Sequence, residues 1–314
     1  HDEFHEQQNW EYNVSLVENI LFEKDLDSKF ENFQDKYYGI GFQLISQPIQ
    51  FFLRDFILKY QNVDIDGAHL LAKHFVIFLF YFISGIFVYL IISNIVNNKY
   101  FSITSTILYL TYPYLLGHAF INPKDIPFLS FWIICTYLSL NLFNRLHENK
   151  KISYLNVLLF SFLSAYLLSI RISGVLIFIQ YLITGIIYLH SEKINITIFL
   201  KKIYKKFLFF IISIIFFAFL FYPVFWKNPL LIFTAIEYMA AHPNDVCTLT
   251  LGKCMEAKKL DSTYIPIWLS VKLPLMILAG LLLLPFTFCL SLFTFHSICI
   301  LLPASNFVLS TFHI

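Results

Sequence analysis

KHFVIFLFYFISGIFVYLIISNIV, the stretch from Lys73 to Val96, decides the fold class. A helix that crosses a bilayer core needs roughly 20 predominantly apolar residues. A helix on the surface of a soluble protein would instead show a polar face along its length. This stretch has no such face, and it therefore predicts a transmembrane helix.

Seven further stretches have the same character, and each is bounded by charge, Pro or Asn. They are Phe101–Phe120, Ile126–Asn144, Tyr154–Ile170, Ile172–Leu189, Phe207–Trp226, Tyr264–Leu284 and Pro285–Pro303. No long alternating strand pattern appears, and helices satisfy their own backbone in lipid. The sequence thus predicts an all-α, polytopic transmembrane helical bundle with about eight spans.

The composition agrees with a membrane protein. Hydrophobic residues make up 58% of the chain and charged residues 13%, which is outside the range of ordinary soluble domains. The formal net charge of +2 argues against nucleic acid as a partner. The chain opens on His1 without Met and stops at Ile314 beside an apolar run, so we expect a fragment of a longer protein.

Positive charges assign the loops to sides. Loops after the first, third and fifth spans carry Lys99, Arg145, Lys150, Lys151, Lys193, Lys201, Lys202, Lys205 and Lys206. By the positive-inside rule these loops are cytoplasmic. The short loops of the other side carry Lys124 and Arg171. We therefore expect an outer segment at residues 1–70, and a transmembrane region at 71–314 with an outer loop at 227–263.

Part of the outer segment has its own helical pattern. Residues Tyr37–Tyr60 place apolar groups at helical spacing, with Gln, Arg and Asp between them. This pattern predicts one or two juxtamembrane amphipathic helices along the membrane surface, broken near Pro48. A surface helix packed on the bundle is the alternative, and the two descriptions are compatible.

The stretch LLGHAFINPKDIPFLSFW, Leu115–Trp132, holds polar residues between two predicted spans. Asn122 suits the cap of the next helix, Pro123 suits its first turn, and Asp125 lies where a carboxylate bonds back. This local role leaves Lys124 unexplained, because a lysine at a helix N-terminus costs up to about 1 kcal/mol. A bound anion explains it, since free amides at a helix N-terminus bind phosphate.

Arg171, in the turn SIRISG, has a comparable predicted depth on the same side. By itself it also fits an interfacial anchor whose head group reaches the membrane surface. Lys124 and Arg171 are jointly better explained by a lipid phosphate than either is alone. The sequence therefore predicts a phosphate site at the outer membrane boundary.

Asp2 and Glu3 form an acidic pair in the outer segment. A sugar attached to a lipid phosphate has a good leaving group, so its transfer to a hydroxyl mainly requires one carboxylate base. Glycoside hydrolases, by contrast, use two carboxylates. The pair thus supplies a candidate base; the alternative is two solvated loop acids.

The cysteines suggest a structural role and no metal site. Cys247 and Cys254 flank a Leu-Gly pair in the outer loop, where an oxidising location permits a disulfide that closes a small hairpin. Two unpaired thiols are the alternative. No CxxC or HExxH pattern is present, so we expect no cofactor and no metal, although a divalent metal stays open.

Several of these motifs together resemble a known family. The acidic pair Asp2–Glu3, followed by His5 and by YYG at Tyr37–Gly39, resembles the GT-C membrane glycosyltransferases. The resemblance is closest to family 39, the protein O-mannosyltransferase and aminoarabinose-transferase-like group. Later landmarks follow in order: GHAFINPKDIPF at 117–128, RISG at 171–174, WKNP at 226–229 and YIPIWLSVKLP at 264–274.

The resemblance implies a GT-C-like fold and a polyprenyl-phosphate sugar donor, with inversion at the anomeric carbon. It implies that Asp2 is the base and that Glu3 supports it. Lys124 and Arg171 would then hold the donor phosphate. The remaining residues that it implies for the pocket are His5, His118, Asn122 and Asp125.

The expected partners are the donor, membrane lipids and a hydroxyl acceptor on a protein, lipid or glycan. We expect an integral protein of the bacterial inner membrane with its site facing the periplasm, or of the endoplasmic reticulum with its site facing the lumen. Two other functions stay open. A transporter or lipid flippase would need ionisable residues near the middle of its spans, where only Lys272 and His296 occur. A non-catalytic assembly subunit is the third reading.

Overall fold

The computed structural model describes residues 2–26, 28–30, 33, 35–240, 247–250, 252–256, 260–273, 275 and 277–283. The side chains of Asp2, Glu3, Met239, Ala240, Cys247, Thr248, Thr250 and Glu256 are outside this description. The chain forms two compact units, residues 1–240 and 241–314. The described residues are helical apart from one small hairpin, which confirms the all-α class.

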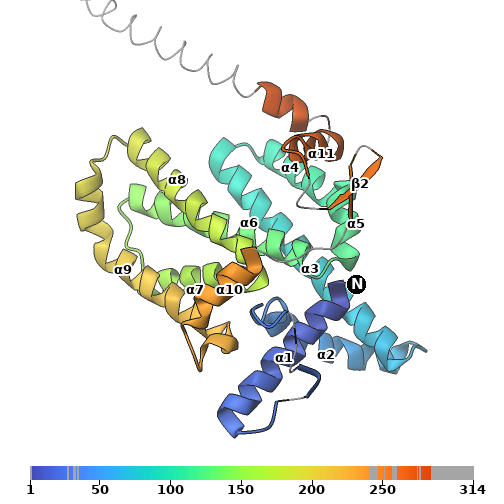
Figure 1. The fold of residues 1–314 in the computed structure, drawn as a ribbon. Coiled ribbons are helices and arrows are strands. Elements are labelled where there is room, and N and C mark those ends of the chain that lie inside the picture. The colour runs from blue at the N-terminus through green and yellow to red at the C-terminus, as the bar shows by residue number, and fades with distance from the viewer. Residues whose placement is uncertain are drawn as a thin grey trace, which may run out of the picture. The chain divides into compact units, whose positions relative to one another are not determined.

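The first unit consists of helices joined by short connections (Figure 1). Its α-helices are α1 (Asp2–Phe22), α2 (Gln43–Tyr60), α3 (Ile65–Val96), α4 (Lys99–Thr111), α5 (Pro113–Ile121), α6 (Asp125–His147), α7 (Tyr154–Ile170), α8 (Leu176–Ser191), α9 (Ile196–Leu220) and α10 (Leu231–Ala240). Short 3-10 turns lie at Ser28–Phe30, Ile172–Val175 and Pro223–Phe225.

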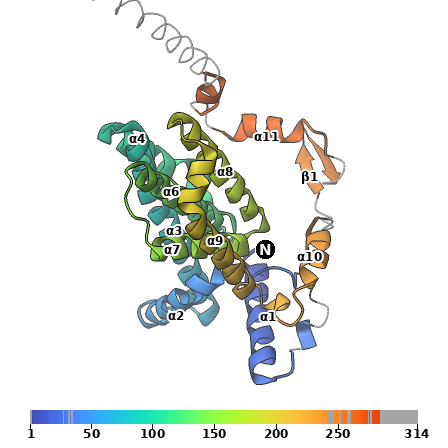
Figure 2. The same ribbon diagram turned by 90° about the vertical axis from the view of Figure 1, so that its left-hand side faces the viewer.

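Helix α3 is the centre of one half of the bundle. It packs against α2, α4 and α6, while α7 packs against α6 and α9 (Figure 2). Small residues make these approaches possible, as in membrane bundles generally. A Cβ on Gly85 of α3 would lie 2.7 Å from Cδ2 of Leu110 in α4, so a larger residue would require the Leu110 side chain to move.

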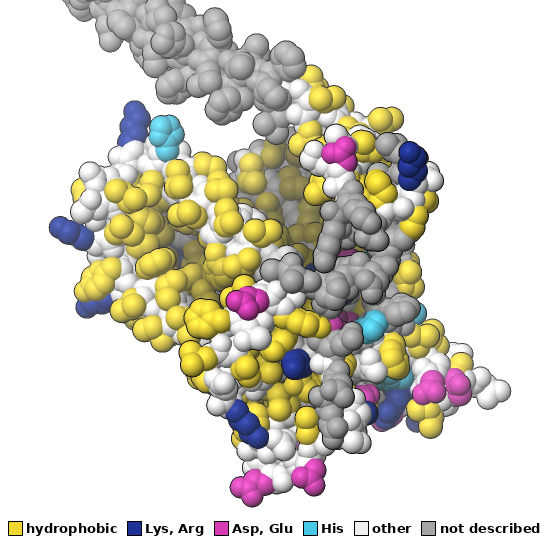
Figure 3. Space-filling view, in the orientation of Figure 1, with side chains coloured by type: hydrophobic (Ala, Val, Ile, Leu, Met, Phe, Trp, Pro, Cys, Tyr) yellow, Lys and Arg dark blue, Asp and Glu magenta, His cyan; other side chains and the backbone are white. Residues whose placement is uncertain are grey.

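Four of the described helices are long and apolar enough to cross a membrane: Ile65–Val96, Asp125–His147, Ile172–Ser191 and Ile196–Leu220. The shorter helix Tyr154–Ile170 is also apolar. Large apolar side chains of α8 and α9 point away from the protein; Leu182 is 64% exposed and Ile215 is 64% exposed. Hydrophobic side chains cover most of the face that these helices present in Figure 3, which suits contact with lipid.

The predicted single span Phe101–Phe120 is wrong. The chain forms two helices there, α4 and α5, which meet at Tyr112 and Pro113. Proline disfavours a helical conformation in the residue before it, and Tyr112 is extended, with φ −61° and ψ 115°. Pro113 then occupies the first position of α5, where its missing N–H costs nothing.

The expected break near Pro48 is also wrong, because α2 continues through this residue. The prolines at 48 and 113 thus have opposite effects. Helix α2 is held along its length by its packing on α3, and this packing outweighs the loss of one backbone hydrogen bond at Pro48.

Helix α2 has a polar buried face and an apolar exposed face. Gln43, Ser46 and Gln50 are fully buried and joined by hydrogen bonds of 2.8–3.0 Å. On the other face, Phe52 is 73% exposed and Phe56 is 55% exposed. This reverses the pattern of a helix in water, and it supports the predicted position along the membrane surface.

Several predicted spans begin or end elsewhere. The predicted span Tyr264–Leu284 is interrupted, because its helix ends at Lys272 and Leu273 is extended. Helix α3 begins at Ile65 rather than Lys73, because Asp64 caps it by accepting from the Gly67 N–H at 2.9 Å. Helix α9 runs from Ile196 to Leu220, whereas the sequence predicted Phe207–Trp226. Its first turns carry the lysines of the preceding loop, and lysine is a good helix former.

The second unit contains strands β1 (Cys247–Thr250) and β2 (Lys253–Glu256), which pair antiparallel, and helix α11 (Tyr264–Lys272). Cys254 is disulfide-bonded. The side chain of Cys247 is outside the described residues, so its pairing with Cys254 stays a prediction. The predicted span Pro285–Pro303 also lies outside the described residues, and the predicted division of the chain at residue 70 stays a prediction as well.

Candidate functional site

The loops of the first unit gather in two polar clusters. One cluster joins the ends of α6, α8 and α9: Nδ1 of His147 lies 3.0 Å from Oε2 of Glu192, and Lys202 Nζ donates to Asn149 Oδ1 at 2.7 Å. The other joins α1 to the starts of α6 and α8. Helix α6 connects the two clusters, and its 23 residues span about 34 Å, which is a membrane thickness.

Each of the two clusters contains charged residues from one of the two sets of loops that the charge pattern distinguished. The first contains Arg145 and Lys150 of the expected cytoplasmic side, where Lys150 forms an ion pair of 2.6 Å with Glu148. This hydrogen bond with the Lys150 ammonium lowers the pKa of the Glu148 carboxyl. The second contains Lys124 and Arg171. Which cluster faces the cytoplasm stays a prediction.

Asn122 organises the start of α6. Its Oδ1 accepts from the backbone N–H groups of Lys124 at 3.1 Å and Asp125 at 2.8 Å, as a capping residue does, although α6 begins at Asp125 and Lys124 occupies its N-cap position. Its Nδ2 donates to Asp125 Oδ2 at 3.1 Å and lies 3.2 Å from Nδ1 of His118. The His118 ring also contacts Tyr114, with ring centroids 4.5 Å apart. His118, Asn122 and Asp125 are therefore one connected group, and their role in a donor pocket stays a prediction.

Lys124 contacts α1 through a residue that the sequence analysis did not single out. Its Nζ lies 3.3 Å from Oε1 of Glu6 and 4.5 Å from the centroid of the Tyr38 ring. Glu6 is only 7% exposed, and a buried carboxylate needs such a partner. The available signal was the spacing, because Glu6 follows Asp2 by four residues and shares its helix face.

Arg171 reaches the same helix start from the other side. Its Nη1 forms an ion pair with Oδ1 of Asp125, the residue that follows Lys124. Both side chains of this pair are substantially exposed, at 42% and 53%, so the pair contributes less than about 1 kcal/mol to stability. The structure thus brings Lys124 and Arg171 to one helix turn, and it gives each a carboxylate partner.

The YYG motif packs behind this cluster. A Cβ on Gly39 would lie 3.0 Å from Cζ of Tyr222 and 3.1 Å from the carbonyl oxygen of Phe221, so a larger residue would crowd this approach. The N–H of Ile40 donates to the same Phe221 carbonyl at 2.9 Å. The motif therefore positions Tyr38 beside Lys124 through backbone contacts with the end of α9.

The other residues that the sequence predicted for the site are His5, Asp2 and Glu3. His5 directly precedes Glu6 in α1, and its Nδ1 is 3.8 Å from Oδ2 of Asp35. The side chains of Asp2 and Glu3 are outside the described residues, although their backbone begins α1. Within the described part of the chain, no group of three or more His, Cys, Asp or Glu side chains is arranged to hold a metal ion.

Comparison with known proteins leaves the family open. No family model matches the chain. No curated protein and no solved structure matches it either. The geometry and the sequence motifs therefore carry the functional argument.

Proposed function

We propose that this protein is a membrane glycosyltransferase of the GT-C type, which moves a sugar from a polyprenyl-phosphate-linked donor to a hydroxyl acceptor. The observation that carries the proposal is a convergence of motifs. At one end of the bundle, ion pairs, a cation–ring contact and a hydrogen bond link Glu6 beside the acidic pair, Tyr38 of YYG, the turn Asn122–Asp125 and Arg171 of RISG. The motif WKNP also reaches α1, because Lys227 Nζ donates to Asn19 Oδ1 at 2.7 Å.

The charge arrangement suits a phosphate held at a membrane boundary. The carboxylates of Glu6 and Asp125 fix the two cations before any donor binds, which lowers the entropy lost on binding. An arginine has five N–H donors and a lysine three, so each cation retains donors beyond its carboxylate contact. Lys124 and Arg171 would thus share the phosphate of the donor, aided by the positive end of α6.

The proposed reaction is a single inverting displacement. Asp2 accepts the proton of the acceptor hydroxyl, and the hydroxyl oxygen attacks the anomeric carbon as the bond to the phosphate oxygen breaks. The polyprenyl phosphate leaves with that electron pair, stabilised by Lys124 and Arg171. Glu3 supports Asp2. General-base assistance of this kind is worth about 10²–10⁴ in rate.

The proposed topology places this cluster on the outer face of an eight-span bundle, in the periplasm or the lumen of the endoplasmic reticulum. The charge distribution of the loops supports this orientation. The four long apolar helices of the described residues support an integral membrane protein.

A non-catalytic assembly subunit is the second candidate, and one observation favours it. The ion pairs Lys124–Glu6 and Arg171–Asp125 fasten α1 and α7 to α6, which a purely structural role also requires. Donor turnover separates the two candidates, because a structural cluster does not release polyprenyl phosphate.

The test is transfer of labelled sugar from a panel of polyprenyl-phosphate sugars by the full-length protein in lipid nanodiscs. Lys124→Ala and Arg171→Ala should each raise the donor KM by about tenfold or more, since each removes one charge-assisted contact to phosphate. Lys59→Ala, at an exposed position of α2, is the matched control. Equal KM values in all three variants, or no transfer from any donor by the wild type, would contradict the proposal.

A further inference from the structure

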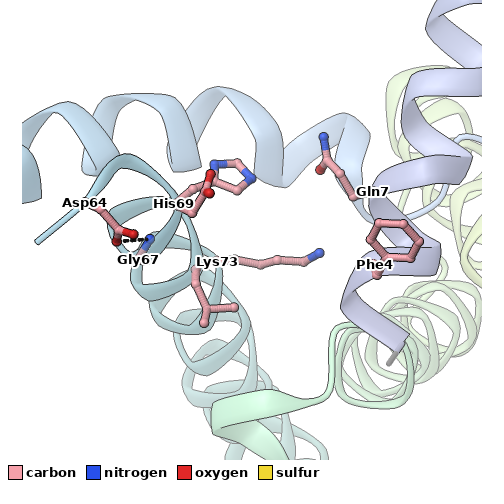
Figure 4. Close-up of a pocket in the computed structure, with 8 residues that line it drawn as sticks. Phe4, Gln7, Asp64, Gly67, His69 and Lys73 are labelled. Carbon is pink, nitrogen blue, oxygen red and sulfur yellow. Dashed lines mark hydrogen bonds between the residues drawn. The ribbon is translucent and has the colours of Figure 1, made fainter.

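A cavity of about 480 Å³ lies between α1 and the first turns of α3. Its walls include Phe4 and Gln7 from α1 and Asp64, Asp66, His69 and Lys73 from α3 and the residue before it (Figure 4). The volume falls in the range of about 300–1,000 Å³ typical of ligand pockets. The sequence analysis used Lys73 only as the boundary of a span, and none of these cavity residues from α3 received a role.

Lys73 is the unusual member of this wall. It is only 3% exposed, and its side chain extends from α3 across the cavity toward α1 (Figure 4). Burial of an ammonium group is costly unless polar groups surround it. The neighbouring positions Ala72 and Val76 are fully buried and apolar, so an apolar residue would have suited the helix packing. The lysine therefore places a charge among buried apolar positions of α3, next to the polar residues Asp66 and His69 of its first turns.

Gln7 gives an independent sign of a ligand. Its Nε2 donates to Glu11 Oε1 at 3.2 Å. Its Oε1 is buried and has no hydrogen-bond partner among the described residues. An unsatisfied buried acceptor costs about 1–3 kcal/mol. Gln7 lines the cavity, so a small movement of its amide would bring this acceptor to a hydroxyl group of a bound ligand.

The other lining groups define the ligand class. The carboxylates of Asp64 and Asp66 accept hydrogen bonds, Lys73 donates them, and His69 does either. Asp64 Oδ1 is fixed by the Gly67 N–H at 2.9 Å. With two carboxylates and one lysine in its lining, the cavity disfavours an anion, whereas a neutral ligand with many hydroxyls matches both kinds of partner. Phe4 adds an apolar ring for the C–H face of such a ligand.

We propose that this cavity binds a sugar ring, and that it is the acceptor subsite of the proposed transferase. This inference rests on the proposed function and narrows the acceptor to a glycan or a glycolipid. The first turns of α1 border both regions, because Glu6 contacts Lys124 while Phe4 and Gln7 line the cavity. The sugar ring and the donor phosphate would thus bind beside the same first turns of α1, the helix that carries the acidic pair, so that the acceptor hydroxyl reaches the anomeric carbon.

The test is saturation-transfer NMR on the full-length protein in nanodiscs, with methyl hexopyranosides, methyl aminohexosides and inorganic phosphate as separate probes. At least one methyl glycoside should give a signal, and Gln7→Leu should weaken its binding about tenfold. Gln8→Leu makes the same chemical change at the next position, which does not line the cavity, and it should bind as the wild type does.

A second pair of variants tests whether a loss of binding results from misfolding. Asp66→Asn should weaken glycoside binding while Asp25→Asn, at an exposed loop position, should not. The inference is overturned if no methyl glycoside binds, if Gln7→Leu and Gln8→Leu bind it equally, or if phosphate is the probe that Gln7→Leu and Asp66→Asn affect.

The outcome is separable from that of the transfer assay. If the protein transfers sugar but the Gln7 and Asp66 variants bind the methyl glycoside as the wild type does, this inference is contradicted and the proposed function is still supported. If glycoside binding depends on these residues but no polyprenyl-phosphate donor supports transfer, the proposed function is contradicted. The protein would then be a sugar-binding membrane protein.

Discussion

Lys124 and Glu6 form an ion pair that joins the start of α6 to the first turns of α1, with Nζ and Oε1 separated by 3.3 Å. Their side chains are only 21% and 9% exposed, respectively. A pair this far from water is held by its charge balance, because either partner alone would be an uncompensated buried charge. The pair therefore links the fold of α1 to the proposed phosphate site.

The single variants Lys124→Met and Glu6→Gln should each destabilise the protein by about 1–3 kcal/mol, since each leaves a buried polar partner unsatisfied. The double variant should lose less than the sum of the two, because no charge is left unpaired. Thermal unfolding of all four proteins in the same detergent measures this. Additive losses would mean that the two side chains do not interact in the membrane.

Asn122→Ala should destabilise the protein, because it removes the two hydrogen bonds that the Asn122 Oδ1 accepts from the Lys124 and Asp125 N–H groups, and loss of a helix cap costs about 0.5–2 kcal/mol. Asn122→Ser retains an accepting oxygen and should recover part of that stability without placing a second carboxylate beside Asp125, whose Oδ2 accepts from Asn122 Nδ2. Thermal unfolding measures both variants. A smaller loss for the alanine variant than for the serine variant would argue against the capping role.

The bundle geometry explains which parts of the fold were predictable. Apolar length alone identified the regions of α3, α6, α7, α8 and α9, because lipid requires continuous hydrophobic helices. The two prolines show the limit. Pro113 interrupts a helix and Pro48 does not, and the difference lies in tertiary packing that a local rule does not contain.

The candidate site likewise contains residues that the sequence predicted and residues that it did not. Asn122, Lys124 and Asp125 were predictable because their chemistry is local to one turn. The Glu6 contact was not, because it depends on how α1 approaches α6. The sequence did not predict the cavity at Lys73. Apolar residues follow this lysine along the chain, so it was interpreted as the first residue of a span.

The two polar clusters should label from opposite sides of the membrane. Single cysteines at positions 124, 171 and 227 should react with an impermeant maleimide on one side, and cysteines at 150 and 205 on the other. This follows because α6 separates the clusters by about one membrane thickness. Labelling of positions 124 and 150 from the same side would contradict the topology.

Cys247 should be the partner of Cys254 in its disulfide. The register pairs Leu249 with Cys254 and Cys247 with Glu256, so the two cysteine positions share one face of the hairpin. Mass spectrometry of unreduced peptides should identify this link, and Cys135, which is a buried free thiol, should appear reduced. A link from Cys254 to any other cysteine would refute the pairing.

The most direct measurement is the turnover of Asp2→Asn in the full-length protein, with labelled sugar on a polyprenyl-phosphate donor. This change keeps the shape of the side chain and removes the base. The account predicts that kcat falls by about 10²–10⁴ while donor binding stays within a few-fold of the wild type, and that the control Asp25→Asn transfers normally. Near-normal transfer by Asp2→Asn would contradict the account, and Asp2 would then be a solvated residue at the start of α1.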